Sequence, residues 1–184
     1  MAQTWRREAE RKRKERPPLD AEGLERLALS YVGRYATTRA KLEAYLGRKV
    51  KERGWEGPGE PPLARIVERF VELGYVNDGA FAASRAASLA RRGYGERRVA
   101  DALRAAGIAG EDAEAALAGA REEAWAAALR FAERKRLGPY AAAPQDRDAR
   151  RKAAAAMLRA GHPLDLVRRL LDASPGEVPD PDLG

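Results

Sequence analysis

The sequence predicts an all-α protein built from tandem three-helix repeats. Ala and Leu dominate its apolar residues, aromatic residues make up only 7% of the 184 residues, and β-branched residues are sparse, so a sheet is not expected. Apolar residues instead recur at the i, i+3, i+4 spacing of a buried helix face. Glycine and proline breakers divide these helices into three triplets of about fifty residues each, which is typical of repeat proteins whose neighbouring units share a core. We therefore expect a short curved solenoid of right-handed helices with little or no β-structure.

The first repeat is expected over residues 20–76. Asp20 can cap its first helix, and Thr37 or Thr38 its second, because these side chains accept hydrogen bonds from the free N–H groups at a helix start. A glycine-rich loop and two prolines separate the second helix from the third, which ends at Gly74.

Residues 1–19, ahead of this repeat, are expected to form a basic, flexible N-terminal arm. Residues 1–16 contain seven basic and three acidic side chains, with Trp5 as the only large apolar group, so they cannot build a core. A second interpretation is an electrostatic tether that follows a phosphate backbone.

The second repeat, over residues 77–120, has the clearest pattern. An Asn-Asp pair opens its first helix, and the turn Gly93-Tyr94-Gly95 leads into a second helix that stops at Gly107. A third helix then opens at Glu111 or Asp112. The result is a helical hairpin with an arginine-rich turn, closed by a third helix.

The stretch over residues 74–108 also carries a specific motif. It reads Tyr-Val-Asn-Asp-x-x-Phe-Ala at the first helix and Arg-Arg-Gly-Tyr-Gly-x-x-Arg-Val, then Leu and Gly-Ile, across the turn and the second helix. This motif resembles the central repeat of the RecX family of recombination regulators. The resemblance implies tandem three-helix repeats that bind the filament formed by the RecA recombinase on single-stranded DNA. It further implies modulation of that filament, usually inhibition of its ATP hydrolysis, strand exchange and co-protease activity, in DNA repair and the SOS response.

The third repeat is expected over residues 121–173, followed by an acidic, proline-rich tail over residues 174–184. Since only Gly119 interrupts the pattern, the third helix of the second repeat can fuse with the first helix of the third. A loop is expected over residues 137–144. Asp146 then caps a helix that ends at Gly161, and Pro163 starts a final short helix.

Basic residues gather near the second helix of each repeat, and the formal net charge is +7. Clustered Lys and Arg favour a polyanionic partner, although solubility alone also accounts for surface charge. Recurrence in each repeat would lay the cations in a line along a solenoid, which suits a filament better than a single duplex site. The candidate partner-binding or nucleic-acid-binding residues are Arg34, Arg39 and Lys41 in the first repeat, Arg91, Arg92, Arg97, Arg98 and Arg104 in the second, and Arg147, Arg150, Arg151 and Lys152 in the third. A structural alternative for Arg91 and Arg92 is compensation of the helix dipole.

The sequence contains no pattern that indicates catalysis, a metal or a cofactor. The lone His162 lies between Gly161 and Pro163 and is interpreted as a turn histidine, and the absence of Cys excludes disulfides and thiolate metal sites. No run of about eighteen apolar residues is present, and the N-terminus lacks an apolar signal region. We therefore expect a non-enzymatic, cytoplasmic protein that acts as a monomer without a cofactor.

Two other functions remain open at this point. Paired helices with a glycine turn and an arginine-rich second helix also fit a helix-turn-helix protein that binds single- or double-stranded DNA directly. A bare helical scaffold would have no partner of either kind. Tyr35 and Tyr94 lie beside arginines, where base stacking is conceivable but anchoring of a turn is favoured.

Overall fold

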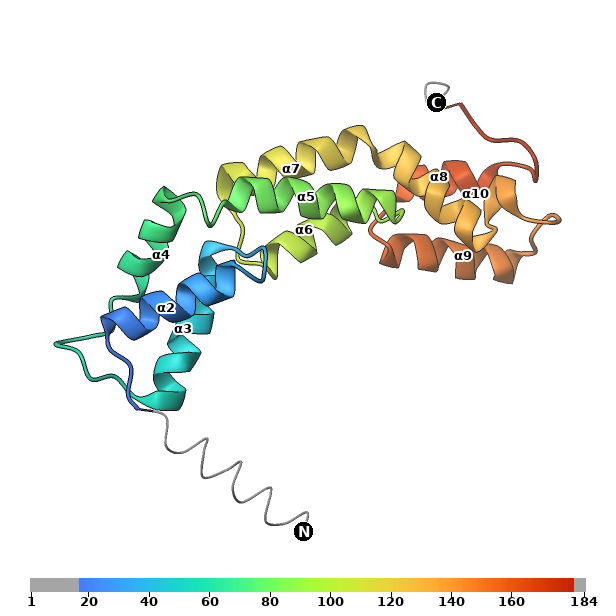
Figure 1. Cartoon of the computed structure of the whole chain (residues 1–184). Coiled ribbons are helices and arrows are strands. Elements are labelled where there is room, and N and C mark those ends of the chain that lie inside the picture. Colours follow the sequence, from blue (N-terminus) through green and yellow to red (C-terminus); the bar gives the residue numbers. More distant parts are fainter. Residues whose placement is uncertain (1–16, 181–184) are drawn as a thin grey trace, which may run out of the picture. The chain divides into compact units, whose positions relative to one another are not determined.

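The computed structural model describes residues 17–180, and its regular elements within this range are nine α-helices and one short 3-10 helix (Figure 1). A single isolated bridge between Leu19 and Trp55 is the β-type pairing found there. The chain divides into two compact units, with the boundary between Asn77 and Asp78. The predicted all-α class is confirmed, and three separate hydrophobic cores each belong to one helix triplet.

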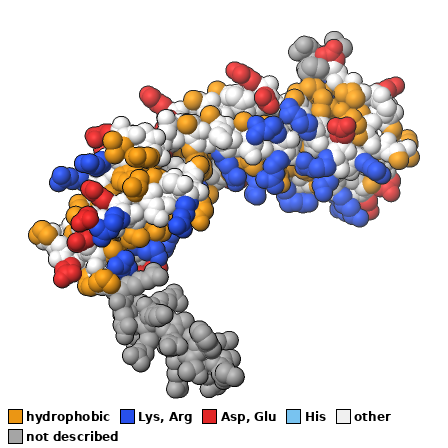
Figure 2. Space-filling model, viewed as in Figure 1, with side chains coloured by type: hydrophobic (Ala, Val, Ile, Leu, Met, Phe, Trp, Pro, Cys, Tyr) orange, Lys and Arg blue, Asp and Glu red, His pale blue; other side chains and the backbone are white. Residues whose placement is uncertain are grey.

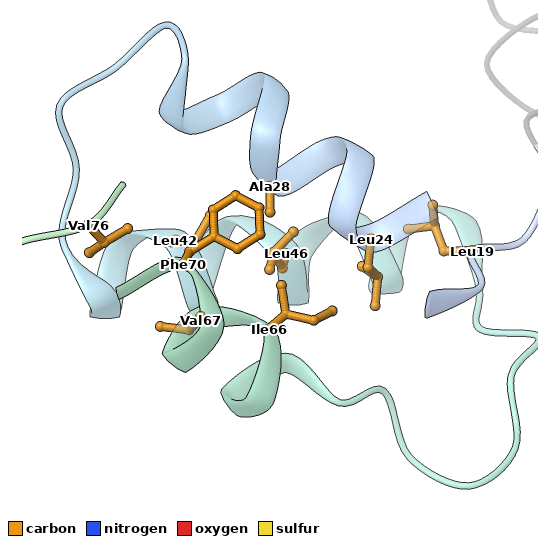
Figure 3. Close-up of a cluster of buried hydrophobic side chains, with 9 residues drawn as sticks. All are labelled: Leu19, Leu24, Ala28, Leu42, Leu46, Ile66, Val67, Phe70 and Val76. Atoms are coloured by element: carbon orange, nitrogen blue, oxygen red, sulfur yellow. The ribbon is translucent and has the colours of Figure 1, made fainter. Parts of the chain in front are cut away.

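The first unit contains one three-helix repeat. Its helices are α2 (Ala21–Val32), α3 (Arg39–Arg53) and α4 (Leu63–Glu72). Their apolar faces meet in one core, because each helix carries its large aliphatic residues on a single stripe. Figure 3 shows this core, which consists of Leu19, Leu24, Ala28, Leu42, Leu46, Ile66, Val67, Phe70 and Val76.

The start of this repeat differs from the sequence prediction. Leu19, assigned above to the flexible arm, is only 2% exposed. Its N–H donates to the carbonyl of Gly54 at 3.0 Å, and its carbonyl accepts from the N–H of Glu56, also at 3.0 Å. Because an aliphatic side chain gains free energy when it leaves water, Leu19 packs into the core and fixes the chain ahead of α2. Residues 1–16 of the predicted arm lie outside the described part of the chain.

The second unit contains the other two triplets. The first consists of α5 (Asp78–Arg91), α6 (Glu96–Arg104) and α7 (Gly110–Glu122). The second consists of α8 (Ala124–Lys135), α9 (Arg147–Arg159) and α10 (Leu164–Asp172), with the 3-10 helix η1 (Gly138–Tyr140) inside the predicted loop.

The fusion of α7 with α8 that the sequence allowed does not occur. The helix breaks at Glu123, whose φ of −90° and ψ of 5° leave the α-helical region. The buried residues Ala116 and Ala120 of α7 belong to the second core, whereas Ala128 and Phe131 of α8 belong to the third. The break therefore separates two helices that serve different cores, and no glycine or proline at residue 123 marks it in the sequence.

Side-chain caps and glycine stops define the other helix ends largely as predicted. Asp20, Thr38 and Asp146 each accept a hydrogen bond from the backbone N–H three residues further on, at 2.7, 3.2 and 2.7 Å. Thr38 rather than Thr37 is the cap of α3. At the end of α6, Gly107 (φ 74°) donates to the carbonyl of Arg104, and the next N–H donates to the carbonyl of Leu103. This Schellman arrangement needs a left-handed residue, which glycine adopts without strain, and it recurs at the glycines that follow α4, α5 and α9.

Candidate interaction surface

The turn between α5 and α6 joins the second repeat to the third. The N–H of Gly95 donates to the carbonyl of Ala160 at 2.9 Å, and the N–H of Arg97 donates to the carbonyl of Gly161 at 3.3 Å. The two backbones approach so closely that a Cβ on Gly95 would lie 2.4 Å from the carbonyl oxygen of Gly161. The start of α6 is therefore fixed against the end of α9. Only glycine allows this approach.

Tyr94, in the middle of the same turn, contributes to both the second and the third core. The guanidinium groups of Arg92 and Arg98 lie over its ring, with 5.4 and 5.9 Å between the guanidinium carbon and the ring centroid. Arg134 of α8 donates to the backbone carbonyl of Arg92. Tyr94 thus anchors the joint, and two of the candidate arginines stack on it while their side chains remain exposed.

His162 lies on the other side of this joint and is fully buried. Its Nε2 is 3.1 Å from the carbonyl oxygen of Gly93, and its Nδ1 has no hydrogen-bond partner within the described residues. A carbonyl oxygen only accepts, so Nε2 carries a proton and donates this hydrogen bond. Burial lowers the pKa of His162 below that of a free histidine, and the bond to Gly93 only partly opposes this shift. The position is that of a packed turn histidine, as the sequence suggested.

Exposed cations gather on α6 and α9. Figure 1 draws these two helices one after the other along one edge of the second unit, and Figure 2 shows Lys and Arg side chains along that edge. We refer to them as the basic strip. Its members are Arg97, Arg98 and Arg104 of α6 and Arg147, Arg150, Arg151, Lys152 and Arg159 of α9, all of them exposed.

Arg159 is the member of the strip that the sequence analysis missed. It follows Lys152 by two helical turns, so both side chains point from one face of α9. That seven-residue spacing was readable in the sequence, but the equivalent residue of the second repeat is Ala105, although the first repeat has Arg48 there.

The cations of the strip differ in how far they are already neutralised. Arg104 pairs with Asp101 at 2.8 Å and Arg151 with Asp148 at 3.4 Å, and Arg150 pairs with Asp172 of α10. The strip members that form no ion pair with another residue of the range 17–180 are Arg97, Arg98, Arg147, Lys152 and Arg159. Arg98 lies over the ring of Tyr94, whereas the other four charges are available to an external anion without breaking an internal contact.

Glu96, the acid closest to the arginines of the turn, does not neutralise them. It pairs with Arg121 of α7 at 2.7 Å. The beginning of α6 therefore retains the positive charge of Arg97 and Arg98.

The first-repeat candidates do not form one cluster. Arg39 pairs with Glu68 of α4 at 2.6 Å, whereas Lys41 is half-buried. Arg34 is exposed beyond the end of α2. Arg91, a candidate of the second repeat, is exposed in the last turn of α5. One candidate of the first repeat does match a candidate of the second: when the second helices of these repeats are aligned with Thr38 on Gly95, Lys41 aligns with Arg98.

Within residues 17–180, no group of three or more His, Cys, Asp or Glu side chains is placed to hold a metal ion. None of the helices in that range is both long and apolar enough to cross a membrane.

Fold and surface together define a protein of tandem three-helix repeats with a basic strip on its second and third repeats. Over 177 residues the chain is 33% identical to Regulatory protein RecX of Myxococcus xanthus (strain DK1622), covering 89% of this chain and 95% of that protein. The description "RecX, second three-helix domain" belongs to a family model that matches residues 77–117. The chain therefore belongs to the RecX family of regulatory proteins.

Further relatives show the same likeness. Regulatory protein RecX of Mycobacterium sp. (strain JLS) is 37% identical over 95 residues, covering 51% of this chain and 50% of that protein. The crystal structure of RecX from Lactobacillus salivarius shares the fold, with a TM-score of 0.61 at 21% identity, covering 82% of this chain and 93% of that one. A second crystal structure of a regulatory protein RecX gives a TM-score of 0.56 at 20% identity and covers 83% and 73% of the two chains.

Proposed function

We propose that this protein is a non-enzymatic regulator of homologous recombination and DNA repair that binds the RecA filament on single-stranded DNA. It inhibits the filament's recombinase, ATPase and co-protease activities, and it acts as a cytoplasmic monomer. Membership of the RecX family, whose members are named regulatory proteins, supports a regulatory role. The observation that carries the proposal is the basic strip, in which five cations form no ion pair within residues 17–180, on two helices that a backbone joint holds together.

The physical argument concerns simultaneous contacts with a repeating polymer. Because the joint fixes α6 against α9, contact of one helix with a filament presents the other at high effective concentration. The unpaired guanidinium and ammonium groups add charge-assisted contacts to carboxylates or phosphates on the filament. A cation that already has an internal partner gains less, because it must first give up that partner.

The test is single-stranded-DNA-dependent ATP hydrolysis by the cognate recombinase, titrated with the full-length protein at substoichiometric ratios. The variant Arg97→Glu with Lys152→Glu reverses one free cation on each helix of the strip. We expect its half-inhibitory concentration to rise about tenfold or more, since each exposed charge contact contributes up to about 1 kcal/mol. The matched control is Arg85→Glu with Arg168→Glu, which reverses the same charge at exposed positions of α5 and α10 outside the strip. Equal inhibition by both variants, with helicity intact by circular dichroism, would remove the strip from the contact surface.

The direct DNA-binding alternative predicts a different result. Tight, sequence-dependent binding to duplex DNA in the absence of any recombinase, lost in the strip variant, would assign the strip to a DNA groove instead.

A further inference from the structure

Three tyrosines and three cations of the first unit surround an open hollow that the proposed filament contact does not use. The hollow has a volume of about 500 Å³ and lies between the end of α2 and the middle of α3. Its tyrosines are Tyr31, Tyr35 and Tyr45, and its cations are Arg34, Arg48 and Lys49.

The tyrosines form a continuous aromatic surface. The rings of Tyr31 and Tyr45 are stacked, with 4.2 Å between centroids and 15° between planes. Tyr35 lies 5.4 Å from Tyr31 at an angle of 50°, and it is 58% exposed. Tyr35 belongs to none of the three hydrophobic cores, and its ring contacts the core of the first unit through Tyr31.

The charge around these rings is positive and largely uncommitted. Arg34 and Arg48 are exposed, and neither forms an ion pair with another residue of the described range. Lys49 pairs with Glu52 at 2.6 Å while its ammonium nitrogen stays 5.7 Å from the ring centroid of Tyr45. The backbone N–H of Arg34 donates to the carbonyl of Tyr31 at 3.1 Å, but within the described residues its guanidinium group makes no hydrogen bond to the last carbonyls of α2, so helix capping does not explain this side chain.

An aromatic surface between two free guanidinium groups matches one class of ligand, an unpaired nucleotide. A base presents a flat π-face to Tyr35, and the phosphates on either side are within the reach of long arginine side chains. In a duplex the base faces are already covered by their neighbours, so only a single strand can use such a platform. A hollow that is open to solvent lets a strand enter and leave, whereas a site for a free nucleotide encloses most of its ligand.

We propose that the hollow formed by Tyr31, Tyr35 and Tyr45 with Arg34 and Arg48 binds single-stranded DNA by stacking one base on Tyr35. This contact needs no recombinase and lies on a different unit from the basic strip. The protein can therefore bind unpaired DNA independently of the filament.

The experiment uses full-length protein and fluorescent oligo(dT) in the background Arg97→Glu with Lys152→Glu, which reduces binding by the strip. Tyr35→Leu removes the aromatic face but keeps an apolar side chain, and we expect it to weaken oligo(dT) binding about fivefold or more. Tyr35→Phe should bind like the parent. The matched control is Tyr75→Leu, because Tyr75 is also exposed and also packs at an angle against one ring, that of Phe70, but lies outside the hollow. It should leave binding unchanged.

Three further measurements separate stacking from charge. An oligomer of abasic deoxyribose phosphates keeps the phosphates and lacks the bases, so Tyr35→Leu should not change its affinity. Arg34→Gln and Arg48→Gln should each make oligo(dT) binding less dependent on salt, by a slope of about 0.7 in log–log form. Oligo(dT) that carries 5-iododeoxyuridine should cross-link to Tyr35 on irradiation, and duplex DNA with the same substituent should not.

The proposal is overturned if Tyr35→Leu binds oligo(dT) like its parent, if the abasic oligomer loses affinity equally, or if thymidine monophosphate alone binds as tightly as the oligomer. None of these results depends on a recombinase. They therefore do not test the proposal that the basic strip binds the filament. Conversely, unchanged ATPase inhibition by the strip variant would contradict the filament contact but not single-stranded DNA binding at the hollow.

Discussion

His162 occupies in the third repeat the place that Ile108 occupies in the second, 54 residues earlier. Both side chains are buried, and both backbone N–H groups donate to a carbonyl five residues back, at 3.2 and 3.0 Å. The histidine adds what isoleucine cannot, a hydrogen bond to the carbonyl of Gly93 in the neighbouring repeat. One substitution within a repeated helix end therefore becomes a polar contact between repeats.

The lowered pKa of His162 predicts a pH-dependent stability. The unfolded chain takes up a proton near the ordinary histidine pKa of about 6.5, whereas the buried ring in the folded state does so only at lower pH. Stability from this group is therefore complete above about pH 6.5 and is lost as the pH falls below it. We expect the urea midpoint of the wild type to fall more steeply than that of His162→Leu between about pH 7 and about pH 5. Subtracting the variant cancels the carboxylates common to both proteins, and parallel curves would show that His162 does not titrate differently on folding.

At the scale of elements, the joint between α6 and α9 is held by backbone contacts that permit no side chain. Gly95→Ala would place a methyl group 2.4 Å from the carbonyl oxygen of Gly161, so either the joint opens or both turns shift. We expect a loss of about 1–3 kcal/mol in the free energy of unfolding, as for other overpacked positions.

Gly119→Ala is the matched comparison for this joint. Gly119 lies inside α7 with no atom within 4 Å of an added Cβ, so alanine should raise helix stability by about 0.5–1 kcal/mol. Urea unfolding of the two variants beside the wild type measures both effects. A Gly95→Ala protein as stable as Gly119→Ala would contradict the tight approach of α6 and α9.

The elements also show what local sequence can and cannot predict. Caps such as Thr38 and stops such as Gly107 depend on a few neighbouring residues, and the sequence placed those helix ends correctly. The break at Glu123 and the burial of Leu19 depend on the core into which nearby side chains pack, so no local sequence pattern predicted them.

The candidate interaction surface also has a part that the sequence could predict and a part that only the fold determines. Recurrence predicted cations on α6 and α9, but it could not show which of them are neutralised. Arg150, for example, pairs with Asp172, which lies 22 residues further along the chain. Nor could it show that the turn Gly93-Tyr94-Gly95 is mainly a joint between repeats, because the contact with Gly161 exists only in the folded unit.

At the scale of the whole molecule, the filament proposal depends on several weak contacts made at the same time. Arg97 and Lys152 belong to different repeats but to one compact unit, and neither is paired with another residue in the range 17–180. If both contact a filament in the same bound state, the free-energy losses of their substitutions should add, since they share no partner.

We therefore expect Arg97→Glu and Lys152→Glu each to raise the half-inhibitory concentration for filament ATP hydrolysis about threefold to fivefold, and the double variant to raise it by about the product of the two. Higher salt should reduce inhibition by the wild type more than inhibition by the double variant, because exposed charge contacts are screened. The opposite outcome is a double variant whose half-inhibitory concentration is no higher than that of the more impaired single variant. That result would mean that the two cations serve alternative contacts, and binding through one helix at a time would replace the multivalent mechanism. Additive losses without the difference in salt dependence would point to disturbed packing at the joint instead, which the urea midpoints of the same variants would reveal.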